Sequence, residues 1–174
     1  MAQKTQQEGG AAGASPPHLH VVVFPWLAFG HMIPFLKLSK RLARRGHAVT
    51  FVSTLRNAAR LGAVPPELSA CLRVVALGLP DVEGLPDGAE STADVPPEKV
   101  GLLKKAFDGL AAPFADLVAA LACADADAAG GSGDAVGVGF SRKPDFIVLD
   151  FAQNWIWPIA EEHEVHYIMC STWC

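Results

Sequence analysis

Strand-like and helix-like segments alternate along most of this chain, and that alternation constrains its fold more than any other feature. Five short apolar runs rich in β-branched residues predict buried strands; they span 19–24, 47–53, 72–77, 145–149 and 166–170. Helical periodicity separates them; it covers 32–45, 54–61, 98–123 and 153–162. This order predicts an α/β fold with a doubly wound, Rossmann-like parallel sheet in the strand order 3-2-1-4-5. We expect the helical region 98–123 to bend or split at Pro113.

Two stretches fall outside this pattern. Residues 1–18 are rich in Gln, Gly, Ala and Pro, and we expect a disordered leader there. Residues 125–143 combine Gly, Ala and Asp without apolar periodicity, which is typical of a flexible surface loop. The remainder is long enough for one domain with a sizeable core.

Composition excludes several classes of function. The formal net charge of −4 argues against a basic surface for nucleic acid. No uninterrupted apolar run approaches the roughly 18–20 residues of a membrane span, and the first 18 residues lack the apolar segment of a secretory signal. The four cysteines show no zinc-like spacing, so we expect reduced, buried thiols. We therefore interpret the chain as a soluble cytoplasmic protein without a membrane span or a nucleic-acid partner.

A histidine and an aspartate mark the ends of two strands that the topology makes neighbours. His31 follows the first strand, and Asp150 ends the fourth. The functional loops of a doubly wound sheet lie at the carboxyl ends of its strands, so we expect His31 and Asp150 to face one crevice. A helix N-terminus disfavours imidazolium, which makes His31 a candidate general base. A buried carboxylate is costly unless paired, so Asp150 is a candidate orienting acid.

Plainer interpretations stay open for the same residues. His31 could pack within its own loop, and Asp150 could cap the helix 153–162. Trp155 and Trp157 flank the turn after the fourth strand, where they could form either core or pocket wall.

Other chemistries find little support. The chain lacks a G-x-S-x-G nucleophile elbow, and the loop after the first strand does not read G-x-G-x-x-G. His163, His166 and Cys170 straddle a predicted helix-to-strand turn, so we predict no metal site.

Several motifs together point to a known family. Pro25, Gly30, His31 and Pro34 form a P-x-x-x-x-G-H-x-x-P core, which RGHAVTFVST follows. Further motifs are VEGLPDGAEST at 82–92, AFDGLAAPFADL at 106–117 and DFIVLDFAQNW at 145–155. As a set they resemble the N-terminal part of plant UDP-sugar-dependent glycosyltransferases (family 1, GT-B fold). In this chain the resemblance extends from about residue 19 to the end, apart from residues 125–143. Two segments are most similar to the branch of this family that adds a sugar to the sugar of an existing glycoside: WLAFGH and EGLPDGAEST. That branch includes rhamnosyl- and glucosyltransferases.

The resemblance implies a reaction and a set of site residues. His31 would deprotonate the acceptor hydroxyl, and Asp150 would hydrogen-bond His31 and stabilise the imidazolium. The acceptor oxygen would then displace UDP from the anomeric carbon with inversion, without a metal. The UDP-sugar would be a hexosyl or rhamnosyl co-substrate rather than a cofactor, and the acceptor a flavonoid, saponin or terpenoid glycoside. Matching positions predict an acceptor-binding set; its members are Phe29, Gly30, Glu83, Phe151 and Trp155.

The resemblance also implies a domain organisation. Residues 19–174 correspond to an incomplete N-terminal acceptor-binding domain, and the C-terminal donor-binding motif is absent from the sequence. We therefore expect this chain alone to be inactive. Two other interpretations are a noncatalytic acceptor-binding or interaction module of the same fold, and an unrelated α/β binding protein whose histidine is structural.

Overall fold

The computed structural model describes residues 18–127, 140 and 142–170, and the structural statements below concern these residues. The strands are β1 His20–Phe24, β2 Ala48–Thr54, β3 Leu72–Leu77, β4 Phe146–Leu149 and β5 His166–Met169. The α-helices are α1 Phe29–Arg44, α2 Leu55–Leu61, α3 Val100–Asp108, α4 Ala111–Asp127 and α5 Ile156–Glu162. Three 3-10 turns join them: η1 Pro66–Leu68, η2 Thr92–Asp94 and η3 Pro97–Lys99.

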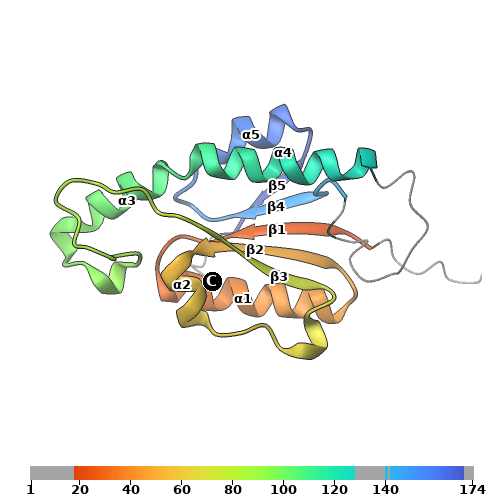
Figure 1. The fold of residues 1–174 in the computed structure, drawn as a ribbon, viewed down its shortest axis with the longest axis horizontal. Coiled ribbons are helices and arrows are strands. Elements are labelled where there is room, and N and C mark those ends of the chain that lie inside the picture. Colours follow the sequence, from red (N-terminus) through yellow and green to blue (C-terminus); the bar gives the residue numbers. More distant parts are fainter. Residues whose placement is uncertain (1–17, 128–139, 141, 171–174) are drawn as a thin grey trace, which may run out of the picture.

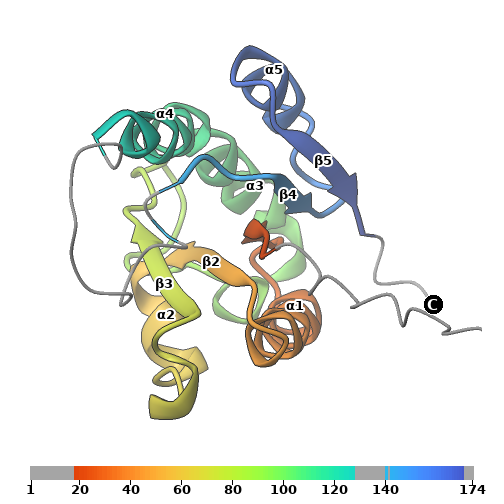
Figure 2. The same ribbon diagram turned by 90° about the vertical axis from the view of Figure 1, so that its right-hand side faces the viewer.

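The strands form one parallel sheet in the order β3-β2-β1-β4-β5 (Figures 1 and 2). This confirms the predicted doubly wound α/β fold and its strand order. The central strand β1 pairs with β2 on one side and β4 on the other, and all five of its residues are buried. The strand order reverses direction between β1 and β4, which is the switch point where such sheets bind ligands.

Alternate residues of the central strand feed two separate core layers. Val21 and Val23 pack on the side covered by α1, together with Phe35 and Ala43. Val22 and Phe24 pack on the opposite side, where α3, α4 and α5 supply the apolar partners; among these are Leu103, Phe107, Phe114, Val118 and Ile156. Figure 1 shows α1 and α4 on opposite sides of the sheet. Period-two alternation in β1 therefore serves both layers at once.

The predicted break at Pro113 is wrong. Helix α3 ends at Asp108 and α4 begins at Ala111, so Pro113 lies in the first turn of α4. Backbone N–H groups in a first turn have no intrahelical acceptor, and proline is tolerated there. The break falls at Gly109, where a Cβ atom would lie 2.6 Å from the Cγ of Pro80. The close approach of the loop after β3 thus requires a glycine.

Other predicted boundaries shift by a few residues. Helix α1 begins at Phe29 and α5 begins at Ile156, each three residues from the predicted start. Most of the predicted leader 1–18 and of the predicted loop 125–143 lies outside the described residues. Two of the described end residues belong to defined structure: His18 Nδ1 hydrogen-bonds the carbonyl of Gly46, at 2.7 Å, and α4 continues through Asp127.

Two predictions from composition meet the structure with different outcomes: the one on membrane spans is not contradicted, and the one on cysteines is. The stretch Pro97–Cys123 is long and apolar enough to cross a membrane by length and composition, although it is not an uninterrupted apolar run. Its apolar side chains, including Phe107 and Phe114, pack against the sheet, which is the arrangement of a core helix. The cysteines that the structure describes are free, but Cys123 is exposed and the other two are half-buried, so the prediction of buried thiols is wrong.

Candidate active site

The carboxyl ends of β1 and β4 bring His31 and Asp150 together. His31 is the third residue of α1, and Asp150 follows the last residue of β4. Parallel pairing sets Phe24 beside Leu149, so the chain leaves both strands at the same level. His31 Nδ1 lies 2.7 Å from Asp150 Oδ2. The juxtaposition expected from the topology is therefore present, whereas the catalytic roles of the two residues stay predictions.

Asp150 is fully buried and its carboxylate accepts three hydrogen bonds. Oδ2 accepts from His31 Nδ1 and from the backbone N–H of Trp26 at 3.1 Å, and Oδ1 accepts from the N–H of Phe151 at 2.8 Å. The N-cap of α5 is Trp155, so the helix-capping interpretation of Asp150 is wrong. Sequence reasoning missed the two backbone donors, because they depend on the path of the loops rather than on residue types.

The contact with Asp150 determines which nitrogen of His31 carries the proton. A carboxylate only accepts hydrogen bonds, so we assign the proton of the neutral ring to Nδ1. Nε2 then presents a lone pair, and the His31 side chain is 17% exposed. The ring can therefore accept a proton at Nε2 while the buried carboxylate faces the positive charge that forms. This is the chemistry of a general base with an orienting acid.

Phe151 provides an apolar surface next to this pair. Its side chain is 59% exposed, and its ring centroid lies 5.5 Å from that of His31. Phe29 begins α1, and the guanidinium of Arg60 lies 5.9 Å from the centre of its ring. Gly30 is exposed, and a Cβ atom added there would meet no atom within 4 Å. Among the predicted acceptor-binding residues, Phe151 is thus the one for which the structure gives a ring contact with His31.

Trp155 faces the core instead. Its half-buried ring contacts Phe24, Phe107 and Phe114, and its Nε1–H donates to Asp108 Oδ1 at 3.0 Å. This geometry favours the core interpretation of Trp155 over a pocket wall. Trp157 is exposed and its ring stacks on that of Tyr167 in the edge strand β5.

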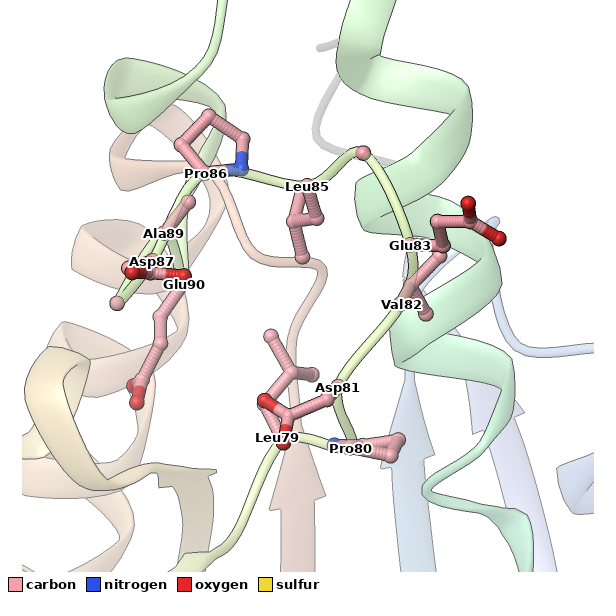
Figure 3. Close-up of a pocket in the computed structure, with 12 residues that line it drawn as sticks. Leu79, Pro80, Asp81, Val82, Glu83, Leu85, Pro86, Asp87, Ala89 and Glu90 are labelled. Carbon is pink, nitrogen blue, oxygen red and sulfur yellow. The ribbon is translucent and has the colours of Figure 1, made fainter.

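Glu83 belongs to the acidic loop 79–90 after β3, which curves around a pocket of about 450 Å³ (Figure 3). Its carboxylate lies on the opposite limb of the loop from Asp87 and Glu90 (Figure 3). The residues lining this pocket do not include His31 or Asp150. The structure therefore does not bring Glu83 into the same pocket as the histidine and the aspartate.

Two contacts hold the turn η2, which follows this loop: one reaches the β1–α1 connection and the other reaches α2. The N–H of Thr92 donates to the carbonyl of Leu27, which lies in the β1–α1 connection, at 2.9 Å. Arg60 makes two hydrogen bonds to Asp94, at 2.7 and 2.8 Å, and this guanidinium holds the pKa of Asp94 well below its usual range. The acidic loop is thereby held next to the loop that leads to His31. In the part of the chain that the structure describes, no group of three or more His, Cys, Asp and Glu residues could hold a metal ion.

No protein-family model matches the chain. Individual relatives do: the chain is 44% identical to UDP-glycosyltransferase 91B1 of Arabidopsis thaliana over 149 residues, which are 84% of this chain and 27% of that protein. It is 36% identical to soyasaponin III rhamnosyltransferase of Glycine max over 152 residues, which are 86% of this chain and 28% of that protein.

The fold is also that of solved plant enzymes. The crystal structure of Arabidopsis thaliana UGT89C1 complexed with UDP-L-rhamnose superposes with a TM-score of 0.70 at 26% identity. That match covers 88% of this chain and 36% of UGT89C1. The chain thus spans about a quarter to a third of the length of the proteins that it matches. In sequence and in fold, it belongs with the plant UDP-glycosyltransferases.

Proposed function

We propose that this chain forms the acceptor side of a UDP-sugar-dependent glycosyltransferase, with His31 as the general base. The observation that carries the proposal is the 2.7 Å contact between His31 Nδ1 and the buried Asp150, at the carboxyl ends of adjacent strands. The exposed ring of Phe151 next to His31 offers a surface on which an apolar acceptor can lie.

The reaction needs one proton transfer and one displacement. Nε2 of His31 takes the proton of the acceptor hydroxyl as the oxygen forms a bond to the anomeric carbon. The bond between that carbon and the UDP oxygen breaks, and UDP leaves with the electron pair. A single displacement inverts the anomeric centre. Asp150 stabilises the imidazolium, and proton removal by such a base contributes roughly 10²–10⁴-fold. We propose that neither a metal nor a cofactor takes part.

The relatives suggest the classes of substrate. One is named for transferring rhamnose to a soyasaponin, and one was solved with UDP-L-rhamnose. We propose a hexosyl or rhamnosyl donor and a flavonoid, saponin or terpenoid glycoside as acceptor, in the cytoplasm. Phe29, Gly30 and Phe151 remain the proposed acceptor contacts, and Glu83 remains one only for a part of the acceptor that reaches the acidic loop 79–90. Trp155 is the weakest member of the predicted set because its ring faces the core.

The length of the match suggests that the acceptor and the donor are bound by different parts of the full-length proteins. The chain spans little more than a quarter of its curated relatives. We propose that residues 19–174 form an incomplete acceptor-binding domain, that the donor site requires further sequence, and that this chain alone transfers no sugar.

A chimera tests the proposal. The chain replaces the matching segment of UDP-glycosyltransferase 91B1, and transfer from UDP-sugars to a panel of flavonoid, saponin and terpenoid glycosides is measured. His31→Ala should lower turnover about 10²–10⁴-fold and leave UDP binding nearly unchanged. His163→Ala, at the end of α5, is the matched control. Turnover of His31→Ala within twofold of the unsubstituted chimera would overturn the proposal.

A further inference from the structure

Gln153 is a buried amide between the two strand ends that carry the His31–Asp150 pair. It follows β4 by four residues, precedes α5, and is fully buried. Its Oε1 accepts the backbone N–H of Asp150 at 2.6 Å. Its Nε2–H donates to the carbonyl of Phe24, the last residue of β1, at 2.6 Å.

These two hydrogen bonds continue the sheet beyond its last paired residues. Phe24 and Leu149 are the final register pair of β1 and β4, and Asp150 is the next residue along. A side-chain amide has the same donor and acceptor as a peptide group. It therefore bridges the two strand ends as a peptide group bridges neighbouring strands, and it satisfies buried backbone groups that would otherwise be costly.

The bridge lies directly behind the site. On one side, Gln153 holds the backbone N–H of the residue whose carboxylate contacts His31. On the other, it holds Phe24, and two residues later the N–H of Trp26 donates to the same carboxylate. The separation of the two strand ends thus sets where the Asp150 carboxylate lies relative to the His31 ring.

We infer that Gln153 is a positioning residue for the general base: it holds the ends of β1 and β4 so that Asp150 orients His31. The inference rests on the proposed function for its effect on turnover, whereas its effect on geometry is independent of that function. Gln153 contacts no acceptor in this scheme, so its loss should lower kcat and leave KM for the acceptor nearly unchanged.

Two substitutions separate positioning from simple stability. Gln153→Leu keeps the size of the side chain but leaves the Asp150 N–H and the Phe24 carbonyl without the amide. Gln153→Glu is the sharper test. When protonated, that carboxyl can accept from Asp150 and donate to Phe24 as the amide does. When ionised, its second oxygen faces the carbonyl oxygen of Phe24. Burial and that carbonyl favour the protonated form, so the bridge should survive at lower pH.

The experiment measures kcat and KM in the chimera, with Asn154→Leu at the exposed neighbouring amide as control. We expect Gln153→Leu to lower kcat about 10- to 100-fold with KM within twofold. For Gln153→Glu, the ratio of its kcat to that of the unsubstituted chimera should be near one at pH 6. That ratio should fall at least tenfold by pH 9. A ratio that does not change with pH, or a loss confined to KM, would overturn the inference.

A second readout separates this inference from the proposed function. In the 174-residue chain, ¹⁵N spectra of the histidine rings should show the Nδ1–H tautomer of His31, and Gln153→Leu should weaken it. An unchanged signal in that variant, with kcat also unchanged, contradicts the positioning role. Should Gln153→Leu fail to fold, the pH-dependent ratio for Gln153→Glu still decides the matter. Full turnover of His31→Ala, by contrast, would refute the role of His31 as general base. The ¹⁵N spectra would then still test whether the hydrogen bonds of Gln153 position Asp150 and His31.

Discussion

Replacing Asp150 by asparagine removes one charge from the site while changing its shape very little. The structure shows why this small change should have two separate effects. Oδ2 accepts from His31 Nδ1 and the N–H of Trp26, and Oδ1 accepts from the N–H of Phe151. All three partners are donors, and an asparagine side chain has only one acceptor atom.

Either orientation of the new amide leaves a conflict. With its NH₂ at the Oδ1 position, it faces the N–H of Phe151, and the Nδ1–H of His31 keeps its acceptor but loses the negative charge. With its NH₂ at the Oδ2 position, it faces the N–H of Trp26, and His31 must move its proton to Nε2. An unsatisfied buried donor costs about 1–3 kcal/mol, so Asp150→Asn should lower the free energy of unfolding by about that amount.

The effect on transfer should be larger than the effect on stability. In the first orientation the imidazolium forms without a compensating charge, and in the second Nε2 can no longer accept a proton. We expect turnover in the chimera to fall about 10²–10⁴-fold.

Two assays check this prediction. Urea unfolding of the 174-residue chain measures the stability change, and initial rates in the chimera measure the transfer. Asp116→Asn, on the exposed face of α4, is the matched control. A stability loss below about 0.5 kcal/mol together with turnover within twofold would refute the reasoning, because that is the range of an ordinary surface substitution.

Three further predictions concern the whole chain. Burial lowers the pKa of His20, so the unfolded chain binds its proton more readily, and stability should fall as pH drops below about 6.5, by at most about 1.4 kcal/mol per pH unit. Urea unfolding at several pH values should show this slope, and His20→Phe should reduce it. The edge strand β5 exposes apolar side chains, so the chain should associate on warming; Ile168→Lys should lower its light scattering, and a scattering-free wild type that unfolds above about 60 °C would contradict this. Calorimetry should find no micromolar affinity of the chain alone for UDP-glucose, since the proposed donor site requires further sequence. Such an affinity would contradict the proposal that the donor site lies outside this chain.

The strand order and the His31–Asp150 contact could be predicted because both follow from coarse features. Apolar β-branched runs locate the strands, and crossover rules leave few ways to order them. Once β1 and β4 are neighbours, the segments that follow them leave the sheet at the same edge, which made the proximity of His31 and Asp150 predictable. The 2.7 Å hydrogen bond itself depends on the conformations of the two side chains.

The finer features depend on packing that a pattern does not encode. Pro113 has the same steric constraint at any position, but its effect vanishes in a first turn, and only the structure shows where α4 begins. The sequence around Trp155 is compatible with a core residue and with a pocket wall, and only its ring contacts favour the core. Gln153 resembles an ordinary polar residue in a turn, because its partners are backbone groups of distant strands.

The pH dependence of transfer in the chimera is the sharpest test of whether His31 is the general base. A neutral imidazole accepts a proton and an imidazolium does not, so turnover should fall on the acid side of the pH profile. We expect His31→Ala to lower turnover by at least about 10²-fold and to abolish that acid-side dependence. An acid-side fall that persists unchanged in His31→Ala, at a rate near that of the unsubstituted chimera, would show that another group takes the proton.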